Sequence, residues 1–174
     1  MKFKKGETVI YPQHGACIVV GTRKMEAFGS SQEYLILRTV INEMTLSVPT
    51  AKASEVGVRP PVSSDELEDL VSVLSKADPR VPSNWSRRFK NHQEKLKSGD
   101  VYQVAEVVRN LAARNRDASL SAAERTMYDR ARINLISEIA PALKVSAEEA
   151  EQYLDEALAK GVLKPAKEPA KKKV

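Results

Sequence analysis

The stretch Val56–Leu70, VGVRPPVSSDELEDL, decides how the chain is divided. Pro60 and Pro61 lack the amide donor that a strand needs, and each restricts the residue before it, so a sheet has to end there. Beyond them the apolar residues recur every three to four positions, and Ser63 with Glu66 forms a capping box that starts a helix. The stretch therefore predicts β structure before the proline pair and helices after it, an α+β chain of two domains.

The residues before the proline pair read as a small all-β domain. Short β-prone segments alternate with turns about every 8–12 residues, a spacing typical of a barrel or sandwich. The expected strands are Thr8–Tyr11, Ala16–Val20, Glu33–Arg38, Met44–Val48 and a last short one within Ala53–Val58. In so short a segment, only a strongly bent sheet of the SH3 or Tudor kind can enclose a core.

The residues after the proline pair predict a compact bundle of about five short helices. Their expected starts are Ser63 or Ser64, Ser83, Asp100, Ser121 and Ser146, where Ser121 and Ser146 open capping boxes with Glu124 and Glu149. The fourth helix is expected to close before Pro141, because proline removes a helical hydrogen bond. Residues 115–120 read as a polar loop, and Gly161 is a natural residue to follow the last helix.

These patterns give three expected regions. Residues 1–60 form the β domain, residues 61–163 the helical domain, and residues 164–174 a basic tail rich in Lys, Pro and Ala that we expect to be disordered. The N-terminus has no apolar run behind its charges, so no signal peptide is expected. No stretch approaches the roughly 20 apolar residues of a membrane span, so no membrane partner is expected.

Composition bounds the chemistry. A net charge of +5 and a pI of about 9.3 permit a polyanionic partner, and the cations gather in residues 80–132 between two acidic segments. The single cysteine, Cys17, suits a reducing cytoplasm, and with only His14 and His92 beside it no zinc site is expected. His14 beside Cys17 reads as a strand corner next to a buried thiol, and His92 as a half-exposed helix residue. We expect no catalytic residue, no metal and no cofactor, and therefore no enzyme.

The stretch Ser83–Lys90, SNWSRRFK, is the candidate binding site. It holds the only tryptophan, Trp85, among the hydrogen-bond donors Arg87, Arg88 and Lys90. Such cations grip phosphates, and an apolar ring can enter a disturbed base step. The alternative is that Trp85 belongs to the core at the start of a helix, and that its polar neighbours lie on the solvent-exposed side of that helix. The predicted apolar stripes of the bundle are complete without Trp85, which favours an exposed ring.

Several segments in register resemble the CarD/CdnL family of bacterial transcription regulators. The N-terminal FKKGETVIYPQHG (residues 3–15) is similar to the family's opening, and NWSRRFK (residues 84–90) to its most telling motif. Further similar segments are YLIL (34–37), VP (48–49), VGVR (56–59), SGDV (98–101), AEVVR (105–109) and LSAAER (120–125). The resemblance covers about residues 1–160 in unbroken order.

This resemblance implies a Tudor-like domain that docks on the β subunit of RNA polymerase and a helical domain that contacts promoter DNA just upstream of the −10 element. Trp85 would enter the minor groove at the upstream edge of the melted bubble and so slow its collapse. Arg87, Arg88, Lys90 and Arg125 match basic positions that face DNA. The chain would act as a monomer in the cytoplasm, associated with the nucleoid through polymerase.

The polymerase-binding edge implied by the resemblance has two parts. One is the strand Thr45–Pro49, with Thr45, Ser47 and Pro49, and the other is Arg23, Lys24 and Met25. Some relatives carry arginines where this chain has Met25 and Ser47. Pairing through backbone groups at a sheet edge tolerates such changes, because its hydrogen bonds do not depend on side chains.

Two other functions stay open from the residues alone. The chain could bind DNA non-specifically on its own, in which case its duplex affinity would be high and steeply salt-dependent. It could instead be a protein–protein adaptor with Trp85 in its core, in which case the ring would be shielded from solvent.

Overall fold

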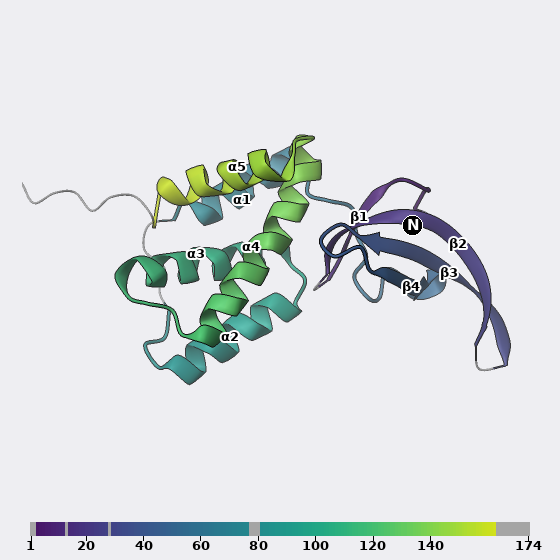
Figure 1. Cartoon of the computed structure of the whole chain (residues 1–174), viewed down its shortest axis with the longest axis horizontal. Helices are drawn as coiled ribbons and strands as arrows, with labels where there is room; N and C mark the ends of the chain where they lie inside the picture. Colours follow the sequence, from purple (N-terminus) through teal and green to yellow (C-terminus); the bar gives the residue numbers. More distant parts are fainter. Residues whose placement is uncertain (1–2, 13, 28, 77–80, 163–174) are drawn as a thin grey trace, which may run out of the picture.

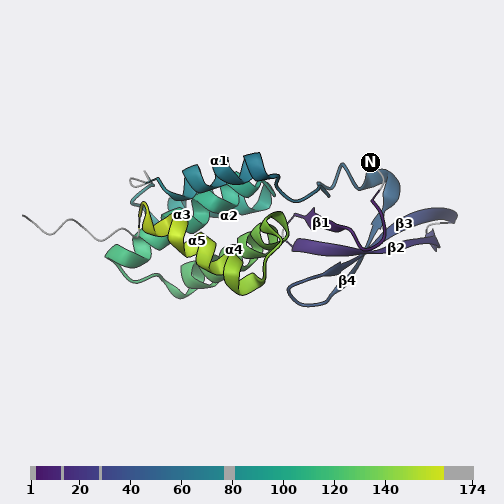
Figure 2. The same ribbon diagram turned by 90° about the horizontal axis from the view of Figure 1, so that it is seen from above.

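A computed structural model of the chain describes residues 3–12, 14–27, 29–76 and 81–162. A curled antiparallel sheet comes first and five helices follow, which confirms the predicted α+β class. Figure 1 and Figure 2 show the sheet at one end of an elongated molecule and the helices at the other. The expected tail, residues 164–174, lies outside the described residues.

The sheet has the strand order β1-β2-β3-β4, so β1 and β4 form its two edges. The strands are β1 (Thr8–Tyr11), β2 (Gly15–Ala27), β3 (Ser30–Thr39) and β4 (Thr45–Pro49). β2 and β3 are longer than predicted and form a hairpin whose register shifts between Val19 and Gly21. Such a bulge bends the strands, which lets the sheet curl around a core that includes Val9, Leu35 and Val48.

The predicted strand within Ala53–Val58 is wrong. A 3-10 helix, η1 (Thr50–Lys52), follows β4, and the backbone then turns on itself, with Val58 N–H donating to the Ala53 carbonyl. Only Arg59 reaches the sheet, where it exchanges two backbone hydrogen bonds with Ile10. Gly57 has φ of +89°, which an extended strand does not allow, so local turn bonds replace the ladder bonds.

The helices are α1 (Ser64–Leu74), α2 (Trp85–Lys97), α3 (Val101–Asp117), α4 (Ala122–Leu143) and α5 (Ala147–Ala159). The predicted caps at Ser63, Asp100, Ser121 and Ser146 are confirmed, because each side chain accepts a hydrogen bond from an amide of the first helical turn. The helices share one core, which contains Leu70, Leu111, Leu135 and Leu154.

Two predicted helix ends are wrong. α3 continues through Asp117, so half of the predicted loop at residues 115–120 is helical. α4 runs past Pro141 to Leu143 and stops where Lys144 takes a left-handed conformation with φ of +58°. Pro141 removes one helical hydrogen bond, but it does not prevent the two residues beyond it from staying helical, and the Val145 N–H closes the end on the Ala140 carbonyl.

Polar contacts to α4 attach the sheet to the helices. The Ala16 N–H donates to Ser137 Oγ at 3.1 Å. The Arg59 guanidinium donates twice to the Glu138 carboxylate, from Nη1 to Oε1 at 2.5 Å and from Nη2 to Oε2 at 3.1 Å. Gly15 has φ of +74°, and a Cβ there would lie 2.7 Å from Ser137 Oγ, so a side chain would push the two parts apart. The sheet and α4 therefore hold a defined mutual orientation.

Candidate nucleic-acid interface

Trp85 is the first residue of α2, at a point that the sequence sets locally. Asn84 is the N-cap, and its Oδ1 accepts a hydrogen bond from the Arg87 N–H at 3.0 Å. Asn is among the best N-cap residues, because a short side-chain acceptor satisfies an amide that has no partner in the helix. The side chain of Trp85 therefore projects from the beginning of a helix rather than from its middle.

The Trp85 ring is held along one edge, covered on one face and otherwise exposed. Its Nε1–H donates to Ser121 Oγ at 3.2 Å and to Glu124 Oε1 at 3.1 Å, both at the start of α4. One face stacks on Phe89, with centroids 4.9 Å apart and planes within 8°. The residue is nevertheless 42% exposed, so the expectation of an exposed ring agrees with its position in the structure.

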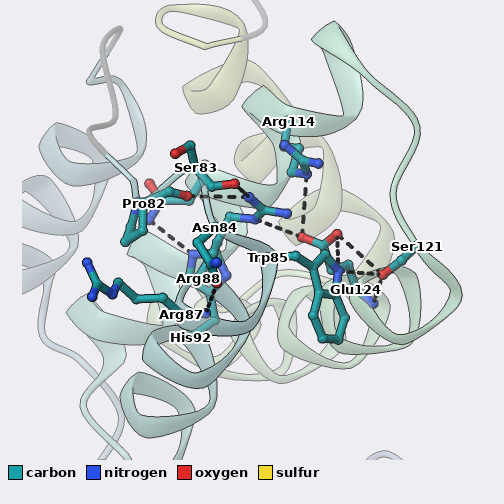
Figure 3. A network of polar contacts seen from close by, with 11 residues as sticks. Pro82, Ser83, Asn84, Trp85, Arg87, Arg88, His92, Arg114, Ser121 and Glu124 are labelled. Atoms are coloured by element: carbon teal, nitrogen blue, oxygen red, sulfur yellow. Dashed lines mark hydrogen bonds and ion pairs between the residues drawn. The ribbon is translucent and has the colours of Figure 1, made fainter.

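A buried ion pair lies behind the ring (Figure 3). Arg88 Nε donates to Glu124 Oε2 at 3.2 Å, and the two side chains are only 2% and 1% exposed. Arg88 Nη1 also donates to the carbonyls of Pro82 and Ser83, at 3.3 and 3.2 Å. Arg114 adds a second cation, with its Nε 3.6 Å from Glu124 Oε2.

The charges around Glu124 decide its protonation. Burial alone would raise the pKa of this carboxyl, but the hydrogen bond and charge of Arg88, the charge of Arg114 and a bond from the Ser121 backbone together lower it. Glu124 is therefore an anion at neutral pH. It can accept hydrogen bonds from the indole and from Arg88 at once, one on each carboxylate oxygen.

Arg88 does not lie on the surface that the sequence prediction assigned to it. The sequence predicts a phosphate-binding cation like Arg87 and Lys90, but the Arg88 guanidinium is buried against Glu124. Helical spacing is the reason, because Arg88 and His92 lie one turn apart on the inward side of α2, and both are buried. In this conformation the Arg88 guanidinium is not available to a phosphate at the surface.

The other three predicted DNA-facing cations lie on the surface. Arg87, Lys90 and Arg125 are all exposed. Within the described ranges none of them joins an ion pair, and Arg125 donates from Nη2 only to the amide oxygen of Asn115, at 3.1 Å. Their charges are therefore available to phosphates.

The two histidines and the cysteine carry no reactive arrangement. His92 is buried rather than half-exposed as predicted, and burial together with the charges of Lys95 and Arg88 lowers its pKa to about 4 despite Glu124. It is therefore neutral and packs beside the amide of Asn110. Burial raises the pKa of Cys17 to about 11, so its thiol stays protonated.

Most of the predicted polymerase-facing residues share one face of the sheet. Arg23 and Pro49 both pair with Tyr34, Met25 pairs with Gln32, Ser47 with Ile36 and Thr45 with Arg38. Partners across strands point to the same side, and this side is opposite to that of the buried Leu35 and Leu37. Lys24 pairs with Glu33 and points the other way. β4 is also an edge strand of the sheet that the described residues form, so one side of its backbone pairs with no further strand there.

Glu124 and Arg114 are the site residues that sequence reasoning missed. The capping box was a correct signal for the start of α4, since Ser121 Oγ accepts from the Glu124 N–H at 3.2 Å. The Glu124 carboxylate, however, bonds to Trp85 and Arg88 from another helix.

The described residues contain no cluster of acidic, His or Cys side chains that could hold a metal. No described helix is long and apolar enough to cross a bilayer.

Both parts of the chain match known protein families. Residues 3–62 match the model described as CarD-like/TRCF RID domain, and residues 69–155 match that described as CarD, C-terminal domain. A relative in Bacillus subtilis (strain 168), the candidate transcription factor YdeB, is 31% identical over 137 residues. That alignment covers 79% of this chain and 90% of the relative.

Proposed function

The chain belongs to the CarD-like family of transcription regulators, which are not enzymes, and we propose that it joins RNA polymerase to promoter DNA. Its β domain, residues 1–60, binds the polymerase β subunit, and its helical domain, residues 61–163, contacts the promoter. The complex then stabilises the open promoter. Polymerase binding is supported by the match of residues 3–62 to a polymerase-interacting, Tudor-like domain.

The observation that carries this proposal is the position of Trp85. A large ring is exposed at the start of α2, anchored by one edge, with Arg87 and Lys90 exposed on the same helix. A ring inserted at a base step has to unstack it, which costs a few kcal/mol and costs least where the duplex is already open. Trp85 is therefore suited to the minor groove at the upstream edge of the bubble, near the −10 element.

By docking on polymerase, the β domain raises the effective concentration of the helical domain at the promoter. A net charge of only +5, shared with acidic segments, implies weak binding to free DNA. Docking on polymerase through the free edge of β4 and the face that carries Arg23, Met25, Thr45, Ser47 and Pro49 makes the DNA contact effectively intramolecular. Lys24 points to the other face of the sheet, so it contributes at most to the rim of the proposed polymerase interface. We propose that the chain works as a monomer on polymerase in the cytoplasm.

Charge reversal tests the DNA contact. Arg87→Glu and Lys90→Glu are each expected to shorten the lifetime of the open complex, because each cation faces solvent without an acidic partner in the described part of the chain. Each change should also reduce the salt slope of DNA binding by about one. Polymerase affinity should stay unchanged, since both residues lie outside the β domain.

Lys160→Glu is the matched control, because Lys160 is an exposed cation at the end of α5. It should leave the lifetime unchanged. Unchanged lifetimes for both α2 variants would contradict the proposed DNA contact. Tight, steeply salt-dependent binding to duplex DNA without polymerase would instead indicate a stand-alone DNA-binding protein.

A further inference from the structure

We infer that Glu124, held by Arg88, is a positioning residue that fixes the Trp85 ring in its DNA-facing orientation before DNA is bound. The inference rests on the proposed function, because it concerns how the ring acts at the promoter. It also limits what the ring can recognise, since the only polar group of the indole is turned into the protein.

The contacts among Trp85, Glu124 and Arg88 form a brace that joins three segments of the chain. Glu124 at the start of α4 accepts from Trp85 through one oxygen and from Arg88 through the other. Arg88 in turn binds the carbonyls of Pro82 and Ser83, which lead into α2. Figure 3 shows these side chains converging between the two helices. The ring is thus tied both to its own helix start and to that of α4.

Burial makes the brace strong. Arg88 and Glu124 are 2% and 1% exposed, so water does not compete for their hydrogen bonds. Hydrogen bonds that involve an ion are about twice as strong as neutral ones, and a low local dielectric strengthens them further. The exposed Trp85 ring is therefore anchored to the buried ion pair of Arg88 and Glu124. A tryptophan that only covered apolar surface would not need such an anchor.

The anchored ring has little rotational freedom left. Phe89 covers one face at a centroid distance of 4.9 Å, and Ser121 and Glu124 hold the Nε1 edge. Immobilising a side chain on binding weakens affinity by about twofold to tenfold, and a side chain that is already fixed avoids this loss. The brace should therefore strengthen the promoter contact by a factor in that range.

The same geometry sets specificity. Indole has a single hydrogen-bond donor, Nε1–H, and no acceptor. Here that donor is used twice inside the protein, so the exposed part of Trp85 is hydrocarbon. The ring should therefore respond to how easily a base step unstacks and not to the hydrogen-bonding groups in the minor groove.

A matched pair of variants isolates the acceptor at position 124. Removing Glu124 alone would also destabilise the fold, because Arg88 would be left buried without a counter-charge. In an Arg88→Met background, Glu124→Gln keeps an acceptor for the indole and Glu124→Leu does not. Neither variant leaves Arg88 or Glu124 as a buried charge, and both remove the carboxylate from Arg114, which is 36% exposed, in the same way. Trp85 is the only tryptophan, so 5-fluorotryptophan labelling of the full chain reports its mobility by fluorine NMR.

With glutamine at position 124 we expect one ring environment and an open-complex lifetime close to that of the wild type. With leucine we expect motional averaging of the ring and a lifetime about twofold to tenfold shorter, at unchanged polymerase affinity. Ser121→Gly should shift both readouts in the same direction but less. It removes the other indole acceptor, while glycine remains acceptable as an N-cap.

The reference variant is Trp85→Ala. If it shortens the lifetime but the folded leucine variant has a fixed ring or a wild-type lifetime, the positioning role is overturned and the proposed function stands. If Trp85→Ala leaves the lifetime unchanged, the proposed function itself fails. Should the leucine variant not fold, Arg88→Met/Glu124→Ala, which also lacks the acceptor, takes its place, and a fixed ring with a wild-type lifetime in it would overturn the positioning role.

Discussion

Replacing Glu124 with leucine is expected to destabilise the protein by about 3–5 kcal/mol, the largest effect that we expect from a single substitution. The reason is the Arg88 guanidinium, which is 2% exposed and has Glu124 as its closest counter-charge. Without that carboxylate, the charge keeps only the carbonyls of Pro82 and Ser83 as partners. Urea unfolding followed by helical circular dichroism measures the change.

The control is the double variant Arg88→Met/Glu124→Leu. It removes both charges from the interior, and apolar replacements of a buried ion pair are often neutral or stabilising. It should therefore recover most of the lost stability, with a coupling energy of roughly 2–3 kcal/mol between the two positions. Additive effects would show that the ion pair does not carry the stability of this region.

Replacing Arg59 with methionine should give the second largest effect, about 3 kcal/mol at neutral pH. Arg59 is the ion-pair partner of Glu138, whose side chain is only 6% exposed. Burial raises the pKa of the Glu138 carboxyl above its usual 4.5 even though Arg59 pulls it down. Removing Arg59 should raise this pKa further and weaken the contact between the sheet and α4.

The effect of Arg59→Met should depend on pH with a definite sign. A carboxyl whose folded pKa lies above its unfolded pKa binds the proton more tightly in the folded state. Stability is therefore unaffected below the unfolded value of 4.5 and falls as pH rises through the folded pKa. The fall should be deeper in Arg59→Met than in the wild type and absent in Arg59→Met/Glu138→Gln. A flat profile for the single variant, measured by thermal unfolding from pH 4 to 8, would contradict this account of the domain contact.

Local chemistry made much of the fold predictable. The proline pair ends the sheet region, and Ser63, Asp100, Ser121 and Ser146 cap the helices as expected, because these signals act within a few residues. The predictions that failed concern the end of α4 and the segment Ala53–Val58, whose backbone conformation is not decided by neighbouring residues alone. Pro141 predicts the end of a helix, yet α4 continues for two residues beyond it, because the loss of one hydrogen bond does not decide where a packed helix ends. Ala53–Val58 looks extended in sequence but satisfies its backbone in turns.

The site was only half predictable for the same reason. Trp85 stands out because it is the only tryptophan and lies among cations, and Asn84 marks the helix start on which it sits. Arg87 and Arg88 are adjacent and chemically alike, yet only Arg88 is buried. Its partner, Glu124, lies 36 residues away and was already explained by a capping box. The capping box already explains a glutamate at position 124, so the sequence gives no sign that its carboxylate also contacts Trp85 and Arg88 on another helix.

The most direct test of the central claim is the lifetime of promoter open complexes after a DNA competitor is added, with wild-type protein, with Trp85→Ala and without protein. Wild type should prolong the lifetime. Trp85→Ala should lose most of this gain, about tenfold if the ring contributes 1.4 kcal/mol, while its fold and polymerase affinity persist. A Trp85→Ala protein that binds polymerase and prolongs the lifetime as fully as the wild type would contradict the role proposed for this ring.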